Sequence, residues 1–172
     1  MKKSFLSAAV FLLLCSACST SKSYPLELAT FVKNSVSVSI YLEKDTDATY
    51  FFSATFTPEP GFHLYSKDLP ITGADGLGRP TLIEAGAESQ YHVTGKLLES
   101  VPAEIPKFEP KNLLVYPVGA VTLRLPIELP PGNSWVDDTV RITYMACSDR
   151  GCKAPVIGQE ILIQIPAKET SH

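Results

Sequence analysis

The chain has 172 residues, of which 45% are hydrophobic and 19% are charged, and its formal net charge is −3. A chain of this length suits one domain with a substantial hydrophobic core. The acidic balance and the lack of any basic run give nucleic-acid binding no electrostatic support. We therefore expect one folded domain and no nucleic-acid partner.

The first residues have the pattern of an export signal. Lys2 and Lys3 form a charged start, and residues 5–14 form an apolar run that small residues follow. This run is too short for a membrane span, which needs about 20 residues. We therefore predict that residues 1–17 are a signal peptide and that the rest of the chain is not embedded in a membrane.

The end of this leader resembles the cleavage site of a bacterial lipoprotein. In "CSAC", small residues precede Cys18, which would carry the lipid and become the first mature residue, although Cys15 replaces the usual leucine. The alternative is ordinary cleavage after Ala17, which would leave Cys18 as a free thiol. The polar "STSKS" suits a tether, so we assign residues 18–30 to the lipid anchor and tether. The expected location is the periplasm, on a lipid anchor in the cell envelope, and Ser19 favours the outer membrane.

The rest of the chain has the pattern of short β-strands. Residues alternate between apolar and polar in runs that are rich in Val, Ile, Thr, Tyr and Phe and bounded by Pro, Gly, Asn and Asp. The expected strands are 35–42, 49–58, 62–66, 80–85, 91–98, 113–117, 120–129, 139–146 and 160–166. About nine such strands predict an all-β fold, an immunoglobulin-like antiparallel sandwich over residues 31–168, with a small barrel as the other option. Two longer irregular segments, 67–79 and 100–112, are candidate functional loops.

The stretch "YMACSDRGCKAP" contains Cys147 and Cys152, which are not part of the leader or anchor. Outside the cytoplasm such a pair is expected to form a disulfide. A purely structural bridge that closes so short a loop stabilises a fold by only about 2 kcal/mol, against almost 5 for a loop of a hundred residues. This comparison favours redox use without settling it. Arg150 and Lys153 favour a thiolate at Cys152, whereas Asp149 opposes it, and the net sign stays open.

No metal or cofactor is expected. Two thiolates need further ligands to hold a metal ion, and His63, His92 and His172 show no metal-ligand spacing.

Four segments together resemble a known family. These are "PGFHLYSKDLPIT" (60–72), "GLGRPT" (76–81), "KFEPKNLLVYPVGAVTLRLPIEL" (107–129) and "YMACSDRGCKAP" (144–155). In this order they are similar to motifs of the N-terminal periplasmic domain of the thiol:disulfide interchange protein DsbD. The resemblance extends from about residue 30 to residue 166.

The resemblance implies an immunoglobulin-like fold and a specific chemistry. The family domain accepts electrons from a thioredoxin-like domain of a membrane thiol transporter and passes them to periplasmic thioredoxin-fold proteins, such as disulfide isomerases and cytochrome c maturation factors. It implies that Cys152 forms the mixed disulfide with a partner and that Cys147 resolves it. Phe108 is the nearest match to the family's aromatic cap residue, and His63 and Tyr65 occupy positions beside the active site. Each of these three side chains has packing as its alternative role.

This sequence departs from the family pattern in three ways. Four residues separate the cysteines, whereas some members have five. The segment around Phe108 reads Phe-Glu-Pro and not aromatic-Gly. The sequence contains neither a transmembrane electron-transfer domain nor a Cys-X-X-Cys thioredoxin domain, so we expect those parts to be separate proteins.

The leading hypothesis is therefore a lipid-anchored thiol–disulfide oxidoreductase that uses the Cys147–Cys152 pair. The main alternative is a non-catalytic immunoglobulin-like binding or assembly lipoprotein with a structural disulfide, since fold alone does not decide function. A thiol-dependent chaperone for one client is a third option.

Overall fold

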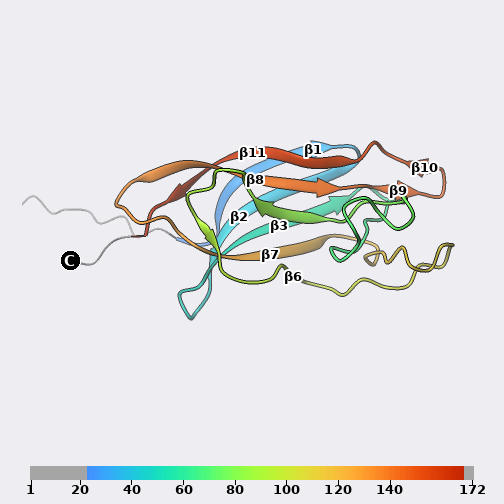
Figure 1. The fold of residues 1–172 in the computed structure, drawn as a ribbon, viewed down its shortest axis with the longest axis horizontal. Coiled ribbons are helices and arrows are strands. Elements are labelled where there is room, and N and C mark those ends of the chain that lie inside the picture. Colours follow the sequence, from blue (N-terminus) through green and yellow to red (C-terminus); the bar gives the residue numbers. More distant parts are fainter. Residues whose placement is uncertain (1–22, 169–172) are drawn as a thin grey trace, which may run out of the picture.

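The structure is a computed structural model that describes residues 23–168, and all regular elements in this range are β-strands (Figure 1). The strands are β1 (Leu26–Lys33), β2 (Val36–Lys44), β3 (Tyr50–Pro58), β4 (Leu82–Ala85), β5 (His92–Val93), β6 (Leu98–Glu99), β7 (Val121–Glu128), β8 (Trp135–Tyr144), β9 (Cys147–Ser148), β10 (Gly151–Cys152) and β11 (Val156–Pro166). They form antiparallel sheets that pack face to face, so the fold is the expected all-β, immunoglobulin-like sandwich.

The larger sheet has the strand order β1-β2-β3-β7-β5, and β6 also pairs with β7. The strict alternation of "VSVSIYLEK" explains its strand β2, because every second side chain is fully buried and the ones between are not. A tight turn joins β1 to β2, and its residues Asn34 and Ser35 have φ angles of 50° and 61°. Such left-handed pairs suit the twist of a hairpin.

The second sheet has the order β11-β8-β4, and β9 and β10 form a separate two-stranded hairpin. Strands β8 and β11 pair along most of their length, from Trp135 opposite Pro166 to Tyr144 opposite Val156. The hairpin of β9 and β10 follows where this long pair ends, so it lies at one end of the sandwich (Figure 1). The long pair thus provides a rigid base for the cysteine-bearing turn.

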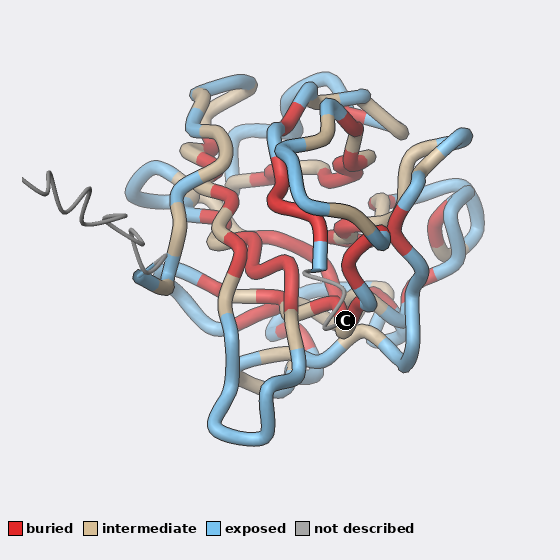
Figure 2. The backbone as a smooth tube through the Cα atoms, turned by 90° about the vertical axis from the view of Figure 1, so that its left-hand side faces the viewer, coloured by how far each residue is buried: buried red, intermediate tan, exposed pale blue. Residues whose placement is uncertain are grey.

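The core lies between the two sheets. Side chains from the inner faces fill it, among them Val38, Ile40, Leu42, Phe52, Phe56, Leu123, Val140, Ile142, Tyr144 and Ile165. Figure 2 shows these buried strand segments at the centre of the molecule, with exposed loops around them. Tyr144 is fully buried, and its hydroxyl donates a hydrogen bond of 2.8 Å to the carbonyl oxygen of Lys33 in the opposite sheet. Burial of this hydroxyl raises the pKa of Tyr144 to about 12.

Several predicted boundaries were wrong. Residues 26–30, which the sequence assigns to a tether, lie in β1, because the partly buried side chains of Leu26 and Leu28 pack against the core. The predicted strand 91–98 divides into β5 and β6 around Gly95, where a side chain would meet the ring of Pro126. The predicted strands 62–66 and 113–117 make only isolated bridges.

The predicted signal peptide, residues 1–17, and the lipidation site Cys18 lie outside the described residues. Within residues 23–168, no helix has the length and apolar character needed to cross a membrane.

Candidate redox site

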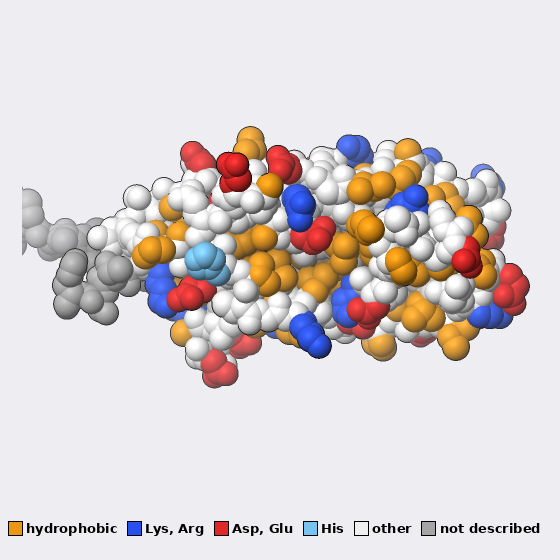
Figure 3. Space-filling model, in the orientation of Figure 1, with side chains coloured by type: hydrophobic (Ala, Val, Ile, Leu, Met, Phe, Trp, Pro, Cys, Tyr) orange, Lys and Arg blue, Asp and Glu red, His pale blue; other side chains and the backbone are white. Residues whose placement is uncertain are grey.

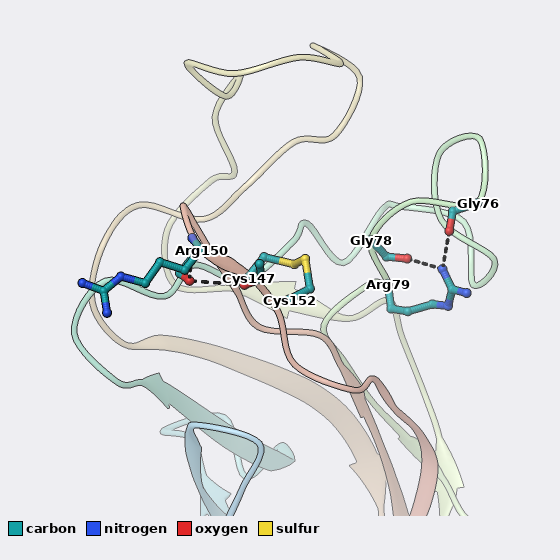
Figure 4. Close-up of a disulfide and its surroundings, with 8 residues drawn as sticks. Gly76, Gly78, Arg79, Cys147, Arg150 and Cys152 are labelled. Carbon is teal, nitrogen blue, oxygen red and sulfur yellow. Dashed lines mark hydrogen bonds between the residues drawn. A yellow bond between two sulfur atoms is a disulfide. The ribbon is translucent and has the colours of Figure 1, made fainter.

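Cys147 and Cys152 form a disulfide across the β9–β10 hairpin (Figure 4). The two cysteines are directly opposed partners in the hairpin, and the turn between them is held by Ser148. The Ser148 hydroxyl donates to the carbonyl oxygen of Gly151 at 3.2 Å and accepts from the backbone N–H of Arg150 at 3.3 Å. Gly151 has a φ of 131°, a conformation that other residues rarely adopt. The local sequence therefore sets the two sulfurs side by side.

The two cysteines differ strongly in exposure. Cys147 is only 2% exposed and packs in a small apolar cluster with Tyr65, Leu69 and Leu113. Cys152, in contrast, is exposed. An approaching thiolate therefore reaches the sulfur of Cys152 first, and Cys147 is shielded as the leaving sulfur.

His63 lies directly beside the buried cysteine. The backbone N–H of His63 donates to the carbonyl oxygen of Cys147 at 2.8 Å, and the N–H of Cys147 donates back to the carbonyl oxygen of His63 at 3.1 Å. This is the pattern of a hydrogen-bonded antiparallel pair, in which the two side chains share one face. Burial lowers the pKa of His63, and the charge of Asp149 opposes this shift.

Phe108 and Tyr65 enclose the His63 ring. The Phe108 ring lies over it with centroids 5.3 Å apart and an interplanar angle of 32°. Tyr65 meets it edge-on, with centroids 5.4 Å apart. Phe108 is 39% exposed, whereas Tyr65 is buried, and burial raises the pKa of Tyr65. The structure thus brings together all five side chains that the resemblance selected, although it does not test their roles.

A pocket of about 590 Å³ opens between the hairpin and two loops, and both cysteines, His63 and Phe108 line it. The Gly-rich loop 72–79 forms one wall. Gly73 in this loop has a φ of 83°, and a Cβ atom there would lie 2.1 Å from the carbonyl oxygen of Leu77. Two exposed apolar side chains, Leu77 and Phe108, line the same pocket, and the neighbouring loop segments carry the exposed Ile71 and Ile105. In Figure 3, hydrophobic side chains recur over the half of the surface that contains the hairpin.

Arg79 is a site residue that the sequence did not single out. Its guanidinium donates to the carbonyl oxygens of Thr72 at 2.9 Å and Gly76 at 3.0 Å, and also to that of Gly78 (Figure 4). Arg79 thereby ties the Gly-rich loop into one wall of the pocket. The available signal was a single arginine in a stretch with three glycines, because a loop without regular structure leaves carbonyl oxygens that need donors.

The cations beside Cys152 do not face the disulfide. The Lys153 ammonium lies 5.3 Å from the centre of the Phe62 ring, and the Arg150 guanidinium points away from the two sulfurs in Figure 4. Asp149, in contrast, lines the pocket. Within residues 23–168, no three His, Cys, Asp or Glu side chains are placed to hold a metal ion.

A scan against protein-family models gives no match, and a search of curated proteins gives none either. Among solved structures, the chain is similar to the N-terminal domain of DsbD from Neisseria meningitidis in its reduced form. The two share 12% sequence identity over 83% of this chain and 86% of that domain, with a TM-score of 0.43. The fold is consistent with the family resemblance that the motifs predict. At this distance the match itself carries no argument about function, which has to come from the residues of the site.

Proposed function

We propose that this protein performs thiol–disulfide interchange through the Cys147–Cys152 pair. The observation that carries the proposal is the unequal exposure of the two cysteines, because Cys147 is 2% exposed and Cys152 is exposed. When only one cysteine of a disulfide is exposed, a partner thiolate attacks the sulfur of that cysteine, here Cys152. A bridge that serves stability alone has no need of this arrangement.

The reaction proceeds in two halves. In the first, a thiolate of a donor dithiol attacks the sulfur of Cys152, the bond between the cysteines breaks, and Cys147 leaves as a thiolate that takes up a proton. The second thiol of the donor loses its proton and attacks the donor sulfur of the mixed disulfide. The bond to Cys152 breaks, and the reduced protein is released. In the second half, the Cys152 thiolate attacks a client disulfide and one client sulfur leaves. Cys147 then attacks Cys152 and releases the reduced client.

The partners proposed are thioredoxin-fold oxidoreductases of the periplasm, and the proposed electron donor is a membrane thiol transporter. The exposed apolar side chains around the pocket support a docking role, because apolar and aromatic residues are enriched at the centre of protein interfaces. The leader pattern and Cys18 support a lipid-anchored location in the cell envelope. Electron flow through this protein would then be directed toward reduction of envelope disulfides.

Trapping tests this function. In a Cys147→Ser variant, Cys152 forms a mixed disulfide that no second thiol resolves, so we expect it to accumulate complexes with thioredoxin-fold proteins of the envelope. The complexes are purified from cells that express the variant and identified by mass spectrometry before and after reduction. The matched Cys152→Ser variant retains only the buried thiol and is expected to capture far fewer. Equal capture by both variants, or capture by neither, contradicts the proposal.

A further inference from the structure

One buried polar atom near the disulfide has no partner. Nε2 of His63 is buried and makes no hydrogen bond within the described part of the chain. A buried polar group without a partner costs about 1 to 3 kcal/mol, so such atoms are rare in folded proteins. An atom of this kind inside a candidate active site points to a chemical role that the oxidised state does not use.

The position of His63 suggests what that role is. His63 and Cys147 are directly opposed across two backbone hydrogen bonds, so their side chains share one face, and both line the same pocket. The rings of Phe108 and Tyr65 pack against the imidazole from two sides. The imidazole is thereby held in the pocket that Cys147 lines, on the same face as the Cys147 side chain.

The buried sulfur needs such a group when it reacts. To resolve a mixed disulfide, the Cys147 thiol must lose its proton, because the thiolate is the nucleophile. The apolar cluster around Cys147 consists of Tyr65, Leu69 and Leu113, with Val115 and Met145 packed against it. Such surroundings disfavour an isolated negative charge. A base that takes the proton during attack avoids a free buried thiolate.

We propose that His63 is the proton acceptor for the Cys147 thiol in the resolving step, an inference that rests on the interchange function proposed above. Nε2 of the neutral imidazole takes the Cys147 proton as the sulfur forms its bond to Cys152. The bond between Cys152 and the partner sulfur breaks, and the partner leaves with the electron pair as a thiolate. The imidazolium then passes its proton to the leaving thiolate or to water, which restores the starting form.

The charges around His63 are compatible with this role. Asp149, Glu109 and Arg79 line the same pocket, and Tyr65 contacts the ring. Burial of the ring is the main influence on the pKa of His63 and lowers it, whereas the charge of Asp149 acts in the opposite direction. The lowered pKa favours the uncharged imidazole, which is the form that accepts a proton.

The test separates attack by Cys152 from resolution by Cys147. Protein reduced with dithiothreitol and then freed of it is mixed with dithiobis(nitrobenzoic acid), which releases one coloured thiolate when Cys152 attacks and a second when Cys147 resolves. A Cys147→Ser variant, which shows only the first release, assigns the phases. We expect His63→Phe, which retains an aromatic ring, to slow the second release about 10- to 100-fold at pH 7 and to leave the first release unchanged.

The pH profile distinguishes proton transfer from packing. With His63 present, the second release is expected to be independent of pH above about 6.5, where the imidazole is neutral. In His63→Phe the rate is expected to rise about tenfold per pH unit between about pH 6.5 and 8.5, because only the thiolate that forms unaided reacts and burial of Cys147 disfavours that thiolate. His63→Gln, monitored by near-ultraviolet circular dichroism for correct folding, should behave like His63→Phe. His92→Phe, at an exposed position on β5, is the matched control and should retain the flat profile.

Equal slowing of both phases, or the same pH slope with and without the imidazole, overturns the role of His63. This result is independent of the interchange function, because the protein is reduced chemically before the reaction starts. Failure of the interchange function would instead appear as a disulfide that reduced thioredoxin does not open.

Discussion

When Cys152 is replaced by serine, we expect the remaining Cys147 thiol to react with iodoacetamide on the order of 100-fold more slowly than the Cys152 thiol of a Cys147→Ser variant. The physical reason is that Cys147 is 2% exposed behind Tyr65 and its neighbours, so it reacts only after local opening. A factor of 100 corresponds to about 2.7 kcal/mol of opening free energy. Alkylation rates are measured by mass spectrometry across a range of pH, so that the plateau values compare the thiolates themselves.

The control for this comparison is the unfolded state. In concentrated urea both variants expose their single thiol, and their alkylation rates should agree within about twofold, because only the folded structure shields Cys147. Faster alkylation of Cys147 than of Cys152 in the folded variants would reverse the roles assigned to the two sulfurs. Equal folded-state rates would remove the asymmetry on which the proposed function rests.

Two Phe→Ala variants are expected to show that fold stability and access to the disulfide depend on different residues. Phe56 is fully buried and packs edge-on against Tyr144 with centroids 5.8 Å apart, so Phe56→Ala should lower the free energy of unfolding by about 3 to 5 kcal/mol. Phe108 is 39% exposed, so Phe108→Ala should change the free energy of unfolding by no more than about 1 kcal/mol. Urea denaturation of the oxidised proteins measures both values.

For the rate of disulfide reduction, the larger effect is expected in Phe108→Ala and the smaller one in Phe56→Ala. The contact between the Phe108 and His63 rings is worth about 0.5 to 1.5 kcal/mol, so its loss should speed reduction by dithiothreitol in the folded protein about 2- to 10-fold. Phe56→Ala, measured under conditions where it remains folded, should not change this rate by more than about twofold, because Phe56 does not line the pocket. An unchanged rate in Phe108→Ala would mean that Phe108 anchors its loop and does not cover the site.

Much of the fold was predictable because a half-buried strand has a period of two. The strands β2, β3, β7, β8 and β11 were all predicted within a few residues, since alternate side chains on each enter one core. The edge strand β1 was not predicted, because its side chains are only partly covered and its pattern is correspondingly irregular. The segments around Tyr65 and Val115 were predicted as strands, but they make single bridges beside the pocket. There the side chains pack against loops and not against a continuous sheet.

The site was predictable in its members but not in its geometry. The cysteine spacing and the family resemblance selected Cys147, Cys152, His63, Tyr65 and Phe108, and all of these side chains gather at one end of the sandwich. The sequence does not show which cysteine is buried, because that depends on loops far away in the chain. For the same reason, the backbone pairing of His63 with Cys147 had no sequence signal.

The positions of the charged groups near the cysteines were also not predictable from the sequence. The sequence left open whether Arg150 and Lys153 act on Cys152, because a flanking position does not determine where a long side chain points. In the structure Lys153 lies over the Phe62 ring, and Arg150 extends away from the sulfurs (Figure 4). The anchoring role of Arg79 likewise depends on carbonyl oxygens that only the folded loop brings together.

The central claim is that the Cys147–Cys152 bond is exchangeable while the protein stays folded, and redox equilibration with thioredoxin tests it most directly. The native protein is incubated with mixtures of reduced and oxidised thioredoxin, the reaction is quenched by alkylation, and the reduced fraction is determined by mass spectrometry. We predict rapid equilibration and a potential close to that of thioredoxin, about −270 mV. A bond that thioredoxin does not open in the folded protein, or one with a potential well below about −300 mV, would identify a structural bridge and contradict the account.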